Sequence, residues 1–201
     1  MGRKTAFLVS LGCGIAVSAP AFAAAAIPPA SLVLAPSELP GFAGAKIKLR
    51  SGTSASSYAK VVLEEKPREV RKEVVTLKRE RFREGVQELL TSGQGEALSL
   101  ALVFASARAA QKEFKARRSE AVKAQGRAKV KRFTVAAIPG SFGFSASEPG
   151  HPYAAANVLF ATGRCYFLVG NSLRNETPEQ ATTAPIAGAT VLYQRVSSLC
   201  A

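Results

Sequence analysis

The sequence predicts a single α+β domain in which helices pack on an antiparallel sheet of about five to six strands. The predicted elements follow the order helix, two strands, helix, several strands and helix, which favours segregated helices on an antiparallel sheet. Successive strands are joined by short glycine-containing loops that are typical of hairpins. The chain has 201 residues, and the part beyond its first segment has an ordinary single-domain length.

Residues 1–23 predict a cleaved signal peptide. Arg3 and Lys4 precede an apolar run, and Ala21-Phe22-Ala23 supplies an A-x-A cleavage site. Polar and small residues interrupt the run, which disfavours a retained membrane anchor because a span needs about 20 apolar residues. We therefore expect a mature chain that begins near Ala24 and is secreted, periplasmic or held in the cell envelope.

A lipoprotein signal is the alternative interpretation of the same segment. Cys13 has the small residue Gly12 before it, but Ser10 stands where such signals carry an aliphatic residue. Acylation at Cys13 would also leave a short apolar region and an Ala-rich tail. Cleavage after Ala23 is the favoured reading.

Two cysteines remain once the leader is removed. An exported compartment favours their oxidation, so we expect a disulfide between Cys165 and Cys200. In the competing interpretation Cys165 is a small buried apolar residue and Cys200 lies in a frayed terminus.

The first half of the mature chain contains an Ala/Pro-rich lead-in, a strand and a charged helix. Residues 24–37 are interpreted as a tether or an extended lead-in, ahead of a domain at 38–201. Polar and apolar residues alternate over 46–50, as in a strand with one solvated face. The charged segment 56–83 has helical periodicity, and Pro67 marks a new start.

The second half alternates strands with two further helices. Thr177 to Gln180 forms a capping box with proline at the first helical position, which predicts the start of the terminal helix. Pro185 should kink or restart that helix. The other predicted elements are a hairpin at 85–91 and 97–105, a helix at 106–124, a strand at 129–138 and a hairpin at 157–161 and 165–169.

The composition excludes several common chemistries. The formal net charge is +13, and removal of Arg3 and Lys4 leaves +11. The chain has no Asp and no Trp, and its single histidine is His151, so an ordinary Ser-His-Asp triad is excluded. Few metal-ligating side chains and no glycine-rich phosphate loop are present, so we expect no metal and no cofactor.

The order of elements also resembles a family. A strand ends at Val103-Phe104-Ala105 before an Ala-rich helix, and Ile138-Pro139-Gly140 and Asn157-Val158-Leu159-Phe160 follow. This pattern resembles small secreted actinobacterial α+β proteins, including mycobacterial lipoproteins of the Mog1/PsbP-like fold and extracellular sensor domains of membrane serine/threonine kinases. The resemblance implies a ligand-binding or partner-binding scaffold in the cell envelope, and it brings no catalytic motif.

Basic residues provide the first candidate site. If the helix at 106–124 lies beside the strand at 129–138, their cations would form one surface that binds an anionic envelope polymer or lipid headgroup. Such a surface is composed of Lys112, Lys115, Arg118, Lys129, Lys131 and Arg132. Export and the apparent core positions of the aromatic residues disfavour nucleic acid as a partner.

Glu148 and His151 provide the second candidate site. Both lie in a Pro- and Gly-rich loop, where a histidine could serve as a general base or pH sensor, although a lone loop histidine is more often simply exposed. Ser141 is the nearest nucleophile, but its surroundings lack the nucleophile-elbow pattern. The leading hypothesis is a non-enzymatic module that binds a small apolar ligand, a protein partner or an anionic surface; the alternative is a hydrolase that uses Glu148 and His151.

Overall fold

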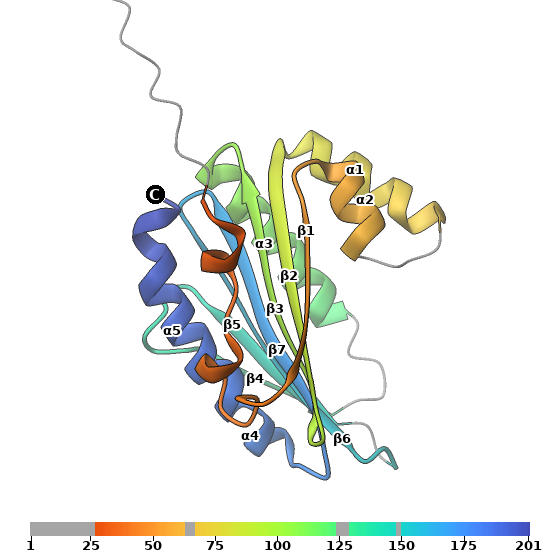
Figure 1. The fold of residues 1–201 in the computed structure, drawn as a ribbon, viewed down its shortest axis with the longest axis vertical. Coiled ribbons are helices and arrows are strands. Elements are labelled where there is room, and N and C mark those ends of the chain that lie inside the picture. The colour runs from red at the N-terminus through yellow and green to blue at the C-terminus, as the bar shows by residue number, and fades with distance from the viewer. Residues whose placement is uncertain (1–26, 63–66, 124–128, 148–149) are drawn as a thin grey trace, which may run out of the picture.

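A computed structural model describes residues 27–62, 67–123, 129–147 and 150–201. Within these ranges seven strands form one antiparallel sheet, in the order β1-β2-β3-β7-β6-β5-β4 (Figure 1). The strands are β1 (Lys46–Gly52), β2 (Phe82–Ser92), β3 (Gly95–Phe104), β4 (Lys129–Phe133), β5 (Phe142–Ser147), β6 (Tyr153–Thr162) and β7 (Cys165–Arg174). The α+β class is confirmed, and the sheet is larger than the five to six strands predicted.

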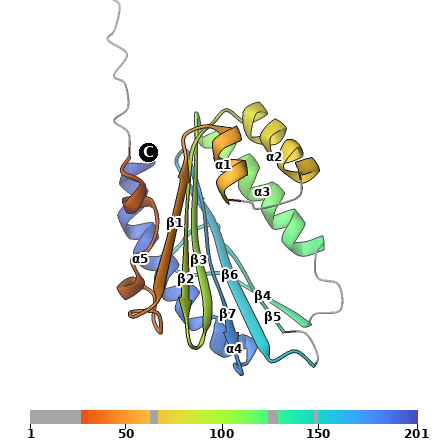
Figure 2. The ribbon, with the colours of Figure 1, turned by 45° about the vertical axis from the view of Figure 1, so that its right-hand side comes forward.

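Helices cover both faces of this sheet. They are α1 (Ala55–Val62), α2 (Pro67–Arg79), α3 (Ala107–Lys123), α4 (Pro178–Ala181) and α5 (Thr183–Leu199), with short 3-10 turns η1 (Pro29–Leu32) and η2 (Pro36–Glu38). In Figure 2, α5 and the N-terminal turns lie on one side of the sheet, and α1, α2 and α3 lie on the other. None of the described helices combines the length and apolar character needed to cross a membrane.

The face beneath α5 holds the larger apolar core. Stacked rings of Phe160 and Phe167, with centroids 4.9 Å apart, meet Leu192 of α5 and the buried leucines of the N-terminal segment. The residues predicted as a lead-in therefore contribute to this core, since Leu32 and Leu34 are fully buried there. Burial of these apolar side chains stabilises the folded state, whereas an extended tether would leave them in water.

Arg195 of α5 ties this N-terminal segment to the helix. Its guanidinium donates to the carbonyl oxygens of Ser31 at 3.1 Å and Val33 at 2.6 Å, and to Glu38 Oε1 at 2.6 Å. Burial raises the pKa of Glu38, but the hydrogen bond and the charge of Arg195 together lower it by more. The pKa of Glu38 therefore lies below its ordinary value. One cation thus satisfies backbone groups of a segment that has little secondary structure of its own.

The charged helical segment predicted at 56–83 is two helices followed by a strand, and the new start predicted at Pro67 is confirmed as the beginning of α2. The second helix ends at Arg79, and Arg81 takes a left-handed conformation with φ 56° before Phe82 begins β2. The ring of Phe82 packs on Tyr58 and Phe104. The strand predicted at 129–138 also ends early, at Phe133, and the chain then turns.

The capping box that opens the terminal helix is confirmed. Gln180 N donates to Thr177 Oγ1 at 3.2 Å, and Thr177 N donates to Gln180 Oε1 at 2.8 Å. The predicted restart is present too, because α4 ends at Ala181 and α5 begins at Thr183. Pro185 lies in the first turn of α5, where an amide hydrogen would have no partner within the helix.

Candidate binding face

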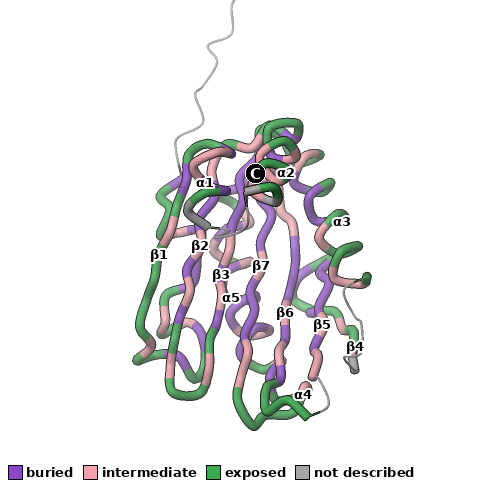
Figure 3. The backbone as a smooth tube through the Cα atoms, turned by 90° about the vertical axis from the view of Figure 1, so that its right-hand side faces the viewer, coloured by how far each residue is buried: buried purple, intermediate pink, exposed green. Residues whose placement is uncertain are grey.

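On the face of the sheet that carries α1, α2 and α3, the described helices cover one end only. Those helices gather over the end where β2 begins and β3 finishes, and Figure 3 looks onto the part of the sheet that the described helices leave uncovered. We call this part the open face. It is composed of strand residues from the opposite end, namely Leu89, Thr91, Glu96, Leu98, Tyr153, Asn157, Ser172 and Arg174.

Strand alternation and register explain why these side chains share one face. Leu98 pairs with Leu89, and Leu98 lies four residues before Leu102, which is buried beneath the helices of this side. Because side chains two and four apart point the same way, Leu98 faces that side as well. Tyr153 pairs directly with Arg174, which brings an aromatic ring and a guanidinium together at the sheet end.

Two adjoining hollows mark the open face. The first, which we call the hairpin pocket, has a volume of about 480 Å³ and lies against the β2–β3 turn and the neighbouring ends of β6 and β7. The second, the central hollow, has a volume of about 210 Å³ and is lined in part by Leu89, Leu98 and Asn157. Glu96 and Ser172 line both, so the two hollows adjoin each other.

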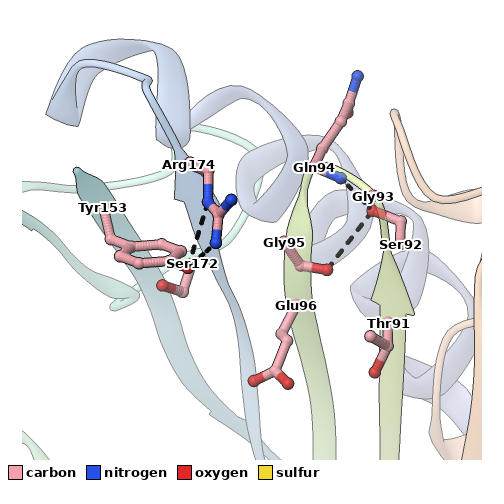
Figure 4. A pocket seen from close by; sticks show the side chains of 9 residues that line it. All are labelled: Thr91, Ser92, Gly93, Gln94, Gly95, Glu96, Tyr153, Ser172 and Arg174. Carbon is pink, nitrogen blue, oxygen red and sulfur yellow. Dashed lines mark hydrogen bonds between the residues drawn. The ribbon is translucent and has the colours of Figure 1, made fainter.

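The hairpin pocket is lined mainly by polar groups. Arg174 donates to the Tyr153 hydroxyl from Nη2 at 2.7 Å and from Nε at 3.3 Å, and its guanidinium carbon lies 5.4 Å from the ring centroid. Figure 4 shows this pair beside Ser172, with the carboxylate of Glu96 on the neighbouring strand. The hydrogen bond to Tyr153 raises the pKa of Arg174, so the guanidinium stays charged.

The predicted basic surface is divided between the two faces of the sheet. Lys131 ion-pairs with Glu179 of α4 at 3.4 Å, on the side opposite α3. Arg132 pairs in register with Phe144 and so faces the α3 side. The side chain of Lys129 lies outside the described residues. The two β4 cations whose placement is described therefore do not lie on one surface.

The three α3 cations of that prediction do lie on one helix. Lys112 Nζ is 3.1 Å from Glu80 Oε1, and the Arg118 guanidinium lies 5.0 Å from the centroid of the Phe142 ring. Lys115 and Arg118 line a shallow hollow of about 350 Å³ with Lys123. Two of the three side chains thus also make contacts within the domain.

The pair suggested for a hydrolase is described only in part. His151 is exposed in the loop between β5 and β6, and Glu148 lies outside the described residues. Ser141 is buried, accepts a hydrogen bond from Val135 N at 2.9 Å and donates to the Val135 carbonyl at 3.3 Å. Its hydroxyl closes a turn, which gives it a structural role.

Cys165 and Cys200 lie together. Cys165 begins β7, Cys200 follows α5, and both are fully buried with their Cα atoms 5.7 Å apart. That separation is compatible with the disulfide predicted from the sequence. It would fasten the end of α5 to the sheet, where Arg164 N also donates to the Cys200 carbonyl at 2.8 Å.

A buried charge cluster beneath α2 was not anticipated from the sequence. Arg117 of α3 binds Glu113 through Nε at 2.6 Å and also Glu73 of α2, so it joins the two helices. Burial raises the pKa of Glu113 to about 7, although Arg117 opposes the shift. The spacing of Glu113 and Arg117, four residues apart, was the available signal, but it does not reveal burial or the partner on α2.

The residues of the hairpin pocket were also missed by sequence reasoning. Tyr153, Glu96 and Arg174 stand at strand ends far apart in the chain, and no motif joins them. The available signal was strand alternation, which says which residues of one strand share a face but does not say which strands are neighbours. Tyr153 is 40% exposed, which is unusual among the aromatic residues of a chain whose rings mostly lie in the core.

Comparisons with known proteins support the fold. No protein-family model matches the chain, and no curated protein matches its sequence. The crystal structure of the extracellular domain of PknH from Mycobacterium tuberculosis is similar, with a TM-score of 0.55 over 83% of this chain and 93% of that chain, at 9% identity. The resemblance to extracellular domains of mycobacterial kinases is thereby confirmed at the level of the fold.

Proposed function

We propose that this protein is a non-enzymatic binding module of the cell envelope whose ligand lies across the open face. The leader predicts export, and the paired cysteines suit an oxidising compartment. The similar solved structure is an extracellular domain. These observations support a location outside the plasma membrane.

The observation that carries the proposal is the uneven coverage of the sheet. The side beneath α5 is packed with buried aromatic and aliphatic residues, whereas the open face keeps half-buried Leu89 and Leu98 next to a polar pocket. Concave sites that combine apolar area with a few convergent polar groups are typical of ligand binding. The two adjoining hollows, of about 480 Å³ and about 210 Å³, have room for more than a single ion.

The experiment measures retention of the purified mature protein on isolated envelope fragments. Leu98→Glu places a charge in the central hollow, and Val191→Glu is the matched control on an exposed position of α5, on the other side of the sheet. We expect the Leu98→Glu variant to lose at least about tenfold in affinity, equivalent to about 1.4 kcal/mol, while the control binds like the wild type. Equal binding by all three proteins, or binding by none, would contradict the proposal.

Adhesion through the cations of α3 is the competing mode of envelope binding. Removal of the charges of Lys112, Lys115 and Arg118 would weaken such binding, and added salt would weaken it steeply. Binding across the open face predicts little effect from this triple substitution. The same measurement of retention on envelope fragments, repeated at low and high salt, separates the two modes of binding.

A further inference from the structure

We propose that the hairpin pocket binds a neutral carbohydrate, such as a segment of an envelope glycan. This inference rests on the proposed function, because it names the class of ligand for the open face. The pocket has room for about one or two sugar rings in its volume of about 480 Å³.

The charges that line the pocket favour an uncharged ligand. Arg174 contributes a guanidinium and Glu96 contributes a carboxylate, and no ion pair joins the two among the described residues. A small anion would meet repulsion from Glu96, and a small cation would meet repulsion from Arg174. A neutral molecule can use both groups, one as donor and the other as acceptor.

The hydrogen-bonding groups match a ligand whose own groups both donate and accept. The carboxylate of Glu96 only accepts and the guanidinium of Arg174 only donates, while the hydroxyls of Thr91 and Ser172 can do either. Sugar hydroxyls likewise donate and accept. A polyhydroxylated ring can therefore satisfy the whole set, which an aliphatic ligand cannot.

The pocket also offers an aromatic surface that is already fixed in position. The ring of Tyr153 is 40% exposed, and Arg174 holds its hydroxyl through two hydrogen bonds. A ring held in this way loses little conformational entropy when a ligand packs on it. The C–H edges of a pyranose provide an apolar surface that can pack on such a ring.

The central hollow continues the same chemistry along the sheet. Gly170 lies beneath the amide of Asn157, and a Cβ at this glycine would lie 2.2 Å from Asn157 Oδ1. The absence of a side chain at Gly170 therefore leaves the Asn157 amide lying across β7, in the hollow that adjoins Glu96 and Ser172. A second sugar would meet this amide and the half-buried Leu98, so the open face suits a chain of sugars.

The experiment titrates the mature protein with soluble neutral oligosaccharides, namely maltohexaose, mannohexaose and N-acetylchitotetraose, and records chemical shifts and heats of binding. We expect at least one to bind, with shifts confined to the hairpin pocket and the central hollow. The affinity should change little between about 50 mM and about 500 mM NaCl, because no net charge is neutralised. Inorganic phosphate and a sulfated oligosaccharide serve as anionic probes.

Variants connect the binding to the pocket. Tyr153→Ala and Glu96→Ala should each weaken binding by about tenfold or more, and Glu96→Gln should retain more affinity because its amide oxygen still accepts. Lys131→Ala, on the opposite side of the sheet, is the control and should bind like the wild type. Thermal unfolding of each variant establishes that a loss of binding is not a loss of fold.

Two outcomes would overturn the assignment. One is binding of phosphate or the sulfated oligosaccharide, in a salt-dependent manner, in preference to the neutral sugars. The other is no binding of any neutral oligosaccharide. If envelope fragments still bind the wild type and lose the Leu98→Glu variant, the open face remains the binding site and the carbohydrate assignment alone is wrong.

Discussion

Removing the link between Cys165 and Cys200 should destabilise the domain by about 4 kcal/mol. The two cysteines are separated by 35 residues, and the chain-entropy model assigns this loop a closure term of about 4 kcal/mol at 25 °C. The loop contains the whole of β7, α4 and α5. Without the link, the conformational entropy of that entire segment in the unfolded chain increases.

The assay is guanidinium chloride unfolding of three forms of the mature protein. They are the oxidised wild type, the wild type reduced with dithiothreitol, and the double variant Cys165→Ala/Cys200→Ala. The reduced wild type keeps both sulfur atoms in the core, so its difference from the oxidised form isolates the covalent link. The double variant also loses the packing of two fully buried sulfur atoms and should be less stable still.

Local protection provides a second measurement. The amide of Arg164 donates to the Cys200 carbonyl, and its hydrogen exchange should accelerate more than that of the central strands when the link is broken. A stability difference below about 1 kcal/mol between oxidised and reduced protein would refute the reasoning, since it would be far below the loop-closure term. Two free thiols in the denatured, unreduced protein would refute it outright.

Four further outcomes are expected. Glu113 has a folded-state pKa of about 7 against an ordinary 4.5, so between these pH values the native state binds more protons than the unfolded state. The unfolding free energy should therefore fall as pH rises from about 4.5 to about 7, by up to about 1.4 kcal/mol per pH unit. Glu113→Gln should flatten that slope in urea unfolding, and an identical slope in both proteins would contradict the burial of Glu113 as its cause. Arg195→Met removes three hydrogen bonds of a guanidinium that is 30% exposed, and should lower the unfolding free energy by about 2 kcal/mol; an unchanged denaturation midpoint would show that the N-terminal segment is held by apolar packing alone. Gly163→Ala should cost about 1–3 kcal/mol in the same assay, because Gly163 has φ +47° and a Cβ there would lie 1.9 Å from the Cys200 carbonyl oxygen; unaltered stability would mean that the chain end relocates freely. Intact mass of the exported protein should correspond to a chain that begins at Ala24, whereas an acylated chain that begins at Cys13 would establish the lipoprotein alternative.

The local features of the fold were accessible from the sequence because they depend on near neighbours. The capping box at Thr177 and the strand at 46–50 each follow from residues close together in the chain, although Ile47 and Leu49 are 57% and 49% exposed, so the single solvated face predicted for that strand is wrong. The new start at Pro67 was predicted, but the end of the helical segment at Arg79 was harder to anticipate, since it depends on Arg81 adopting a left-handed backbone conformation without a glycine. The burial of Leu32 and Leu34 depended on a partner, α5, that lies more than a hundred residues away.

The candidate site illustrates the same limit. Half of the basic residues of the predicted anion-binding surface lie on a predicted strand. A one-residue step along a strand reverses the side chain, so Lys131 and Arg132 lie on opposite faces. Glu96, Tyr153 and Arg174 come together only because β3 pairs with β7 and β7 pairs with β6. Alternation within each strand assigns a face, but it does not name the neighbouring strand.

The sequence by itself predicted the α+β class, the pairing of Cys165 with Cys200 and the start of the terminal helix, and its first 23 residues support the proposal of an exported protein. Each follows from local periodicity, composition or a short motif, whose physics acts within a few residues. The tertiary structure alone decided that the described helices leave one end of a sheet face uncovered and that a polar pocket lies there. Those features depend on long-range strand pairing and on where the helices end relative to the sheet. No local sequence pattern specifies either.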